Sequence, residues 1–295
     1  MLGRILTEQS KPQVRVTTTK LRDALRVGLA RTASPTPPAA HDWFRCSGLP
    51  RLCPRMYALA MQQAFSLDIE VDADLGWTFG IGTAMHRQFQ EEFLRLLPAG
   101  VFQGWWRNRA TGYVAKGDSL ALSHNGDSLS HCWAPMPSGS SDDYEYVEIS
   151  FRNTEYRLTG HCDGVLVWPG EEPEIFELKT INETGYGNVD PDNGGKPKAD
   201  HVLQAQAYLW LSGLQRARIV YFCKRFGRFD NMLCEHVIHR DEATIADIKS
   251  TLMQAREVLE GDGTKMPLRL AECRSKSSER AKYCAAKVAC FTPSV

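Results

Sequence analysis

The middle of the chain carries short apolar runs that alternate with polar positions and are separated by turn-forming residues, a pattern typical of β-strands. This β region extends from about residue 100 to residue 181. Within it we expect one strand from Tyr156 to Trp168 and another around Glu177. A further strand is predicted from Arg218 to Lys224. The central part of the chain is therefore expected to form a sheet.

Apolar residues at helical spacing recur in three other segments. The first covers residues 81 to 97, the second runs from an N-capping Asp200 through Leu214, and the third runs from Asp241 to Glu260 and ends at Gly261. Predicted helices come before and after the predicted strands along the chain, which indicates an α/β fold. The expected buried stripes are Met85, Phe89, Phe93 and Leu96 on the first helix and Ile245, Ile248, Leu252, Ala255 and Leu259 on the third.

Breaks in these patterns indicate the organisation of the chain. Residues 1–40 are polar and basic and end in a proline-rich run, which is typical of an arm or linker. Residues 41–295 are expected to form a single domain. Within it, 111–146 is predicted to be an insertion, and 182–199 is too rich in Gly, Pro and Asn for regular structure, which predicts a mobile loop.

Composition adds limits to this picture. The chain has 295 residues, of which 43% are hydrophobic, enough for one substantial core. We expect neither a membrane span nor a signal peptide, because no apolar run is long enough, and we predict a cytoplasmic protein. The formal net charge is zero, but both ends are basic. Basic ends can bind phosphates, although they can equally be solvated tails.

Glu177 and Lys179 are the candidate reactive residues. Residues two apart on a strand point to the same side, so their carboxylate and ammonium emerge together. The same parity places His161 and Asp163 on one face of the preceding strand. Two carboxylates and a lysine suit metal-assisted phosphodiester hydrolysis, which needs oxygen ligands for Mg²⁺ or Mn²⁺ and a cation near the attacking water. Taken alone, Glu-x-Lys on a strand is more often a pair of solvated surface charges.

Further motifs surround this pair in a fixed order. They are a helical His86, Gly160 to Asp163, Glu177 to Lys179, and Gln204 followed four residues later by Tyr208. In this order the sequence resembles the RecB-type branch of the PD-(D/E)xK nucleases. The resemblance implies a restriction-endonuclease-like mixed sheet flanked by helices.

The resemblance also implies roles for these residues. His86, Asp163, Glu177 and the main-chain carbonyl of Leu178 would bind Mg²⁺ or Mn²⁺. Lys179 would orient the attacking water. Gln204 and Tyr208 would position the scissile phosphate. Weaker candidates for contact with DNA are Arg55, Tyr186, Lys224, Trp105 and Trp106.

The nine cysteines form a second pattern. An odd number without a secretory signal favours a reducing compartment over a disulfide framework. Cys132, Cys162, Cys223 and Cys234 are interpreted as small buried hydrophobes.

The cysteines near the two ends are different. Four thiolates there can close around a 4Fe-4S cluster or a structural zinc and staple the ends together. They are Cys53, Cys273, Cys284 and Cys290. The Cys-Pro-Arg context of Cys53 resembles the iron–sulfur exonucleases of the RecB group, including the CRISPR-adaptation nuclease and phage relatives. The spacing departs from that family, because Cys273 lies eleven residues before Cys284. Cys46 is a rival first ligand.

The resemblance implies a metal-dependent DNA exonuclease that favours single-stranded ends in recombination, repair or CRISPR-type processing. Its partners would be DNA and a recombinase or CRISPR-adaptation complex, in the cytoplasm of a bacterial or phage-infected cell. Two alternatives stay open: a DNA-binding or assembly subunit that keeps the fold without turnover, and a structure-specific endonuclease.

Overall fold

A computed structural model describes most of the chain and leaves the ends and several internal segments aside. The predicted arm lies outside the described residues except for a short helical turn at 25–27, as does most of the predicted insertion. The described ranges are 25–27, 43–49, 52–62, 73–115, 133–137, 141–224, 231–261, 266–282, 284 and 286–292.

The main sheet is mixed and holds the predicted Glu-x-Lys strand in its interior. Its strands lie in the order β11 (Leu233–His239), β10 (Arg216–Cys223), β9 (Glu174–Ile181), β8 (Gly164–Leu166), β2 (Phe102–Asn108) and β3 (Val114–Ala115). β9 and β10 are parallel, whereas β8 runs antiparallel to β9. The described parts of the predicted insertion, β4 (Ala134–Pro135) and β5 (Tyr144–Val147), pair with β2.

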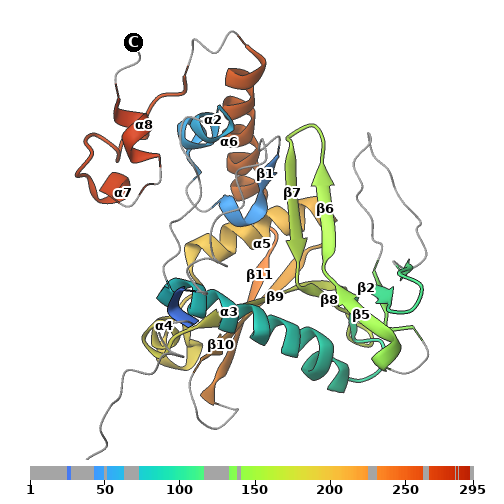
Figure 1. The fold of residues 1–295 in the computed structure, drawn as a ribbon. Coiled ribbons are helices and arrows are strands. Elements are labelled where there is room, and N and C mark those ends of the chain that lie inside the picture. Colours follow the sequence, from blue (N-terminus) through green and yellow to red (C-terminus); the bar gives the residue numbers. More distant parts are fainter. Residues whose placement is uncertain are drawn as a thin grey trace, which may run out of the picture.

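A smaller sheet stands beside the main one (Figure 1). It consists of β1 (Phe44–Arg45), β7 (Leu158–Cys162) and β6 (Ile149–Asn153), with β7 in the middle. The single strand predicted over 156–168 is therefore wrong, because the chain leaves β7 for the main sheet at Asp163. Gly164 permits this break: its φ is +155°, and a Cβ there would lie 2.3 Å from the Phe102 ring.

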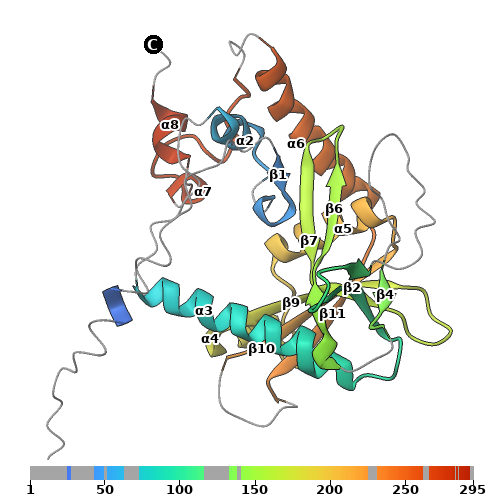
Figure 2. The same cartoon turned by 45° about the vertical axis from the view of Figure 1, so that its right-hand side comes forward.

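Helices cover both faces of the main sheet. α5 (Ala199–Ser212) packs on one side, with α6 (Glu242–Glu260) packed against α5, and α3 (Ala73–Gln88) crosses the other side (Figures 1 and 2). Alternate residues of β10 accordingly join two hydrophobic clusters, with Ile219 in the first and Val220 in the second. The predicted α/β class is thus confirmed, and the arrangement is consistent with a restriction-endonuclease-like fold.

The first predicted helix differs from the structure at its end. After α3 the chain forms a π-helical turn over Phe89–Phe93 and a 3₁₀ turn over Leu94–Leu96. A π-turn takes up more residues than an α-turn, so it shifts the later side chains around the axis. Phe89 and Leu94 are buried, whereas the predicted core residues Phe93 and Leu96 are 39% and 83% exposed.

The later elements match the sequence more closely. α6 begins after its cap Asp241, whose side chain accepts from the amides of Ala243 and Thr244, and it ends at Gly261 as predicted. α5 begins at Ala199, so Asp200 lies in its first turn rather than at the cap. The absence of regular structure predicted for 182–199 is wrong, because α4 (Glu183–Val189) forms there with Asn182 as its N-cap. The asparagine accepts from the amide of Gly185 and so offsets the low helix propensity of the glycines.

The C-terminal segment returns to the start of the domain. α2 (Pro54–Met61) packs against α6, and α8 (Lys287–Phe291) contacts α2, with α7 (Glu279–Lys282) close by (Figure 2). Arg55 on α2 donates to the carbonyl of Pro267 across 2.9 Å. Among the described residues, no helix combines the length and apolar character that a membrane crossing requires.

Candidate active site

Asp163 and Glu177 meet where the two sheets join. Asp163 lies between β7 and β8, and its Oδ2 accepts from the main-chain amide of Leu178 across 2.7 Å. Both carboxylates are nearly inaccessible, with 5% of Asp163 and 3% of Glu177 exposed. Oε2 of Glu177 is buried and has no hydrogen-bond partner among the described residues. An unpartnered buried carboxylate oxygen is costly to a protein unless something else binds it.

Residues from α3, from the π-helical turn that follows it and from β5 hold Asp163 in place. His86 Nδ1 lies 3.2 Å from Asp163 Oδ1, and Gln90 Nε2 donates to the same oxygen across 3.3 Å. The hydroxyl of Tyr146 donates to the Asp163 carbonyl across 2.8 Å. The predicted convergence of the helical histidine with the carboxylates is therefore observed.

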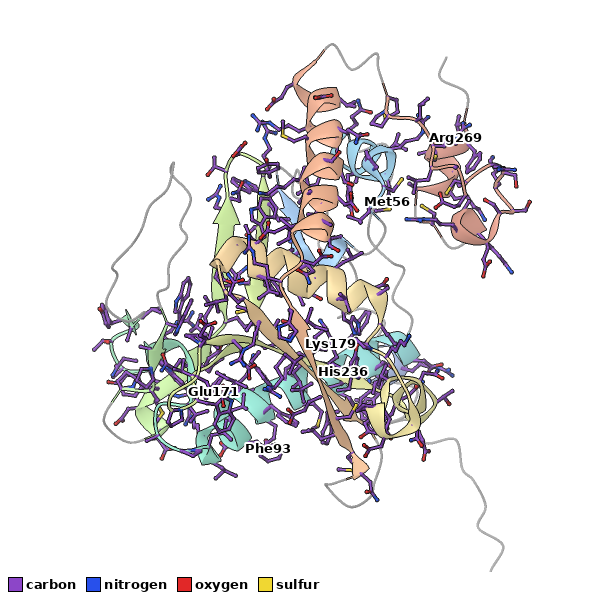
Figure 3. The ribbon with its side chains drawn as sticks, turned by 180° about the vertical axis from the view of Figure 1, so that it is seen from behind. Met56, Phe93, Glu171, Lys179, His236 and Arg269 are labelled. Carbon is purple, nitrogen blue, oxygen red and sulfur yellow. The ribbon has the colours of Figure 1, made fainter. Side chains whose placement is uncertain are left out.

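Lys179 links Glu177 to α5. Its Nζ lies 2.7 Å from Glu177 Oε1 and 2.8 Å from Gln204 Oε1. Gln204 Nε2 in turn donates to the Tyr208 hydroxyl across 2.9 Å, and this hydroxyl donates to the carbonyl of His161. Figure 3 shows Lys179 between α5 and the main sheet. Gln204 and Tyr208 thus position Lys179, and Tyr208, only 1% exposed, is placed to support the site rather than to touch a phosphate.

Gly160 makes room for this network. A Cβ at residue 160 would lie 2.5 Å from the Cys46 sulfur and 2.8 Å from the Tyr208 ring. No larger residue fits without displacing the tyrosine that aligns Gln204. The first residue of the predicted Gly160 to Asp163 motif is therefore a glycine because a side chain there would collide with Cys46 and Tyr208.

Burial and charge perturb the titration of the site. Burial raises the pKa of Glu177 to about 7, although Lys179 acts in the opposite direction. For Lys179, burial lowers the pKa, but Glu177 and Asp163 outweigh it and leave the pKa raised. His86 behaves similarly: burial lowers its pKa, and the hydrogen bond and charge of Asp163 more than reverse the shift. Lys179 is consequently an ammonium at neutral pH.

The site opens into a cavity of about 420 Å³. Its acidic lining includes Glu148, whose pKa is raised by burial and by the charge of Asp163. Its lining also includes the basic and hydroxylic residues Arg45, Ser47 and Thr159. These four residues were not predicted from the sequence. Gln90 also was missed, although it follows His86 by four residues on one helix face, which was a readable signal.

The cysteines divide as predicted into two groups. Cys162, Cys223 and Cys234 are buried, which confirms their interpretation as small hydrophobes, while Cys132 lies outside the described residues. Cys46, the rival first ligand, is fully buried in the core against Gly160.

The four terminal cysteines lie within electrostatic reach of one another. Burial raises the pKa of Cys53, and the charges of Cys284, Cys273 and Cys290 raise it further. All four are half-buried. In the part of the chain that the structure describes, however, no three His, Cys, Asp or Glu side chains stand close enough to hold a metal ion as they are placed.

Several predicted DNA contacts are corrected by burial. Tyr186 and Trp106 are 6% and 1% exposed and cannot stack on bases. Arg55 is committed to the Pro267 carbonyl. Trp105 packs partly buried against the first cluster. Lys224 is half-buried just beyond β10, where its amide donates to the carbonyl of Ile181.

Comparison with known proteins gives distant structural likenesses. No protein-family model and no curated protein matches the chain. The chain is similar to an alkaline exonuclease from Laribacter hongkongensis, with 16% identity, a TM-score of 0.45 and coverage of 75% of this chain and 90% of the other. It is also similar to a phage-related exonuclease from Haemophilus somnus 129PT, with 21% identity, a TM-score of 0.29 and coverage of 36% and 56%.

The Laribacter enzyme in complex with dAMP gives 23% identity, a TM-score of 0.31 and coverage of 38% and 57%. At this distance a likeness does not transfer an activity. The function has to be inferred from the side chains that line the cavity.

Proposed function

We propose that this protein is a divalent-cation-dependent nuclease of the PD-(D/E)xK class that cleaves DNA, acting as an exonuclease on single-stranded ends. The observation that carries this proposal is the buried pair Asp163 and Glu177 beside an ammonium at Lys179. A buried carboxylate with a free oxygen suits a cation, and the lysine suits the charge that develops on a phosphate under attack.

The donor types around the cavity suit a hard cation such as Mg²⁺ or Mn²⁺, although no three of its His, Asp or Glu side chains stand close enough to hold one as the described residues are placed. Oxygen donors from Asp163, Glu177 and the Leu178 carbonyl would hold it, with His86 at the edge of the set. Oε2 of Glu177 is the atom that supports this fit, because it is buried without any other described partner. When bound, the cation would activate water and neutralise charge on the phosphate.

The other side chains act by position and charge. An ammonium carries three N–H donors, and Lys179 directs two of them to Glu177 and Gln204. The third is left for the attacking water or for a phosphate oxygen. Because its pKa is raised, Lys179 orients and stabilises rather than removing a proton. Tyr208 fixes Gln204, which fixes the ammonium.

Removal of the cation or of Asp163 should abolish cleavage. The assay follows end-labelled single-stranded DNA with Mg²⁺ or Mn²⁺ and with EDTA. Asp163→Asn keeps the shape of the side chain but removes its charge, so we expect a loss of at least about 100-fold. The control is Asp247→Asn, on the exposed side of α6, which should match the wild type. Equal cleavage by wild type and Asp163→Asn would contradict the proposal.

The four terminal cysteines are proposed to hold a 4Fe-4S cluster, with structural zinc as the alternative. What supports this is their donor chemistry, their mutual effect on the pKa of Cys53, and the contact between α2 and α8. Bound there, a metal would join both ends of the domain and contribute to folding.

Loss of one of these ligands should remove the metal and lower the melting temperature. Protein purified without oxygen is expected to be brown and to contain iron and acid-labile sulfide. Cys284→Ala should be colourless and less stable, whereas Cys234→Ala, in β11, should keep its metal. A colourless wild type with one zinc per chain supports the alternative, and a metal-free wild type contradicts both.

A further inference from the structure

The outer face of the small sheet is polar and basic. Burial alternates along its strands, so Phe44, Phe151 and Leu158 enter the core while their neighbours face outward. The pairing register sets Arg45 and Arg152 on either side of Thr159 in one row. The next row along β7 joins His161 to Ser150. We call this surface the small-sheet outer face; it comprises Arg45, Ser150, Arg152, Thr159 and His161.

Its two arginines lack acidic partners. Arg45 and Arg152 form no ion pair with any described residue, whereas most of the other described arginines face a carboxylate, as Arg107 faces Glu145 across 3.5 Å. They stand two strands apart, about 10 Å. Two uncompensated like charges on one face form a ready site for a polyanion.

Arg152 is held in a defined orientation. Its guanidinium carbon lies 3.7 Å from the centre of the Trp43 ring. Stacking on an aromatic face leaves the N–H edge of a guanidinium free, and this edge is the part that binds phosphate oxygens.

The face is continuous with the catalytic cavity. Arg45, Thr159 and His161 line the same cavity as the carboxylates. Four residues of extended chain separate Thr159 from Asp163, about 13 Å along the backbone. The arginine row therefore begins beside the carboxylates and leads away from them, where the adjoining part of the same strand would run.

We infer that the small-sheet outer face is a track for the sugar–phosphate backbone of the strand being cut. Arg45 and Arg152 bind phosphates next to the scissile one, and Trp43 orients Arg152. This inference rests on the proposed nuclease function and adds the path of its substrate. It also replaces the contacts predicted from the sequence at Arg55 and Tyr186.

Salt dependence of binding tests the track. A fluorescent single-stranded oligonucleotide is titrated with full-length protein in Ca²⁺ at several salt concentrations. Removing one arginine–phosphate interaction should reduce the slope of log K against log salt by about 0.7. Arg45→Ala and Arg152→Ala should each weaken binding about 10-fold. The double variant should lower the slope by about 1.4. Arg152→Lys keeps the positive charge and should therefore keep most of the wild-type slope.

Matched controls make the result decisive. Arg107→Ala removes an exposed arginine from β2 and should leave both affinity and slope unchanged. Melting temperatures show whether the double variant is folded. A folded double variant with the wild-type slope overturns the track, even where the wild type cleaves DNA. A reduced slope in a protein that never cleaves DNA supports the track and overturns the nuclease proposal instead.

Discussion

Glu177→Gln is expected to abolish DNA cleavage and at the same time to raise the melting temperature of the metal-free protein at pH 8. The loss of activity follows from the loss of a charged ligand. The gain in stability follows from burial: Glu177 is 3% exposed, its Oε2 has no described partner, and burial outweighs the attraction of Lys179 in its effect on the pKa. A neutral amide removes a charge that the folded protein accommodates poorly.

The pH dependence gives the sign of this effect. Burial raises the pKa of Glu177 from 4.5 to about 7 in the folded protein. Folding therefore favours the protonated form, and this contribution is complete below pH 4.5 and is lost as the pH rises through 7. Wild-type protein should lose up to about 3 kcal/mol over this range, and the glutamine variant should lose less.

Thermal unfolding in EDTA at pH 5.5 and pH 8 measures the difference. Glu174→Gln is the comparison, since Glu174 is buried on the same strand and its Oε2 also lacks a described partner, while its Oε1 accepts a 2.6 Å hydrogen bond from Arg218. Loss of the Glu174 charge leaves Arg218 without its buried partner and should destabilise the protein at both pH values. If Glu177→Gln melts below the wild type at pH 8, the burial argument fails.

Lys179→Met should reduce cleavage by about 100- to 1,000-fold while leaving DNA binding in Ca²⁺ nearly intact. Methionine replaces the unbranched stem of lysine without its terminal nitrogen, so it provides no donor to Glu177, Gln204 or the substrate. If Lys179 contributes charge to the transition state rather than affinity, as proposed, the change should fall on kcat and not on KM.

The control and the contrary result are clear for this variant. Lys249→Met removes an α6 lysine that stacks on Trp210 and should cleave like the wild type. Lys179→Arg keeps the charge, but its planar fork cannot reproduce the two 2.7 to 2.8 Å contacts, so only weak activity is expected. Full activity in Lys179→Met would remove the lysine from the mechanism.

The reactive residues could be predicted because strand periodicity is a local property. Glu177 and Lys179 emerge on one side of β9, and Phe176 and Leu178 join the second cluster, as two-residue spacing requires. α6 and its cap Asp241 could be predicted for the same reason. Each of these rests on a few neighbouring residues whose propensities agree.

The features that were missed depend on distant residues. The break at Asp163 needs the Phe102 ring against Gly164, and the π-turn after α3 is not visible in apolar spacing. Glu148 showed no signal, because it lies between β5 and β6 at the edge of the predicted insertion. Tyr186 looked like a loop aromatic until α4 buried it.

The position of β9 between a parallel and an antiparallel neighbour limits errors in its register during folding. β9 is bonded to β10 along its whole length and to β8 over Glu174 to Phe176. A slip of one residue would turn Glu177 and Lys179 into an aromatic cluster and bring Phe176 and Leu178 into the cavity. Both β10 and β8 must lose their pairing for this to happen, so the alignment of the strand that carries the candidate reactive residues is fixed from both sides.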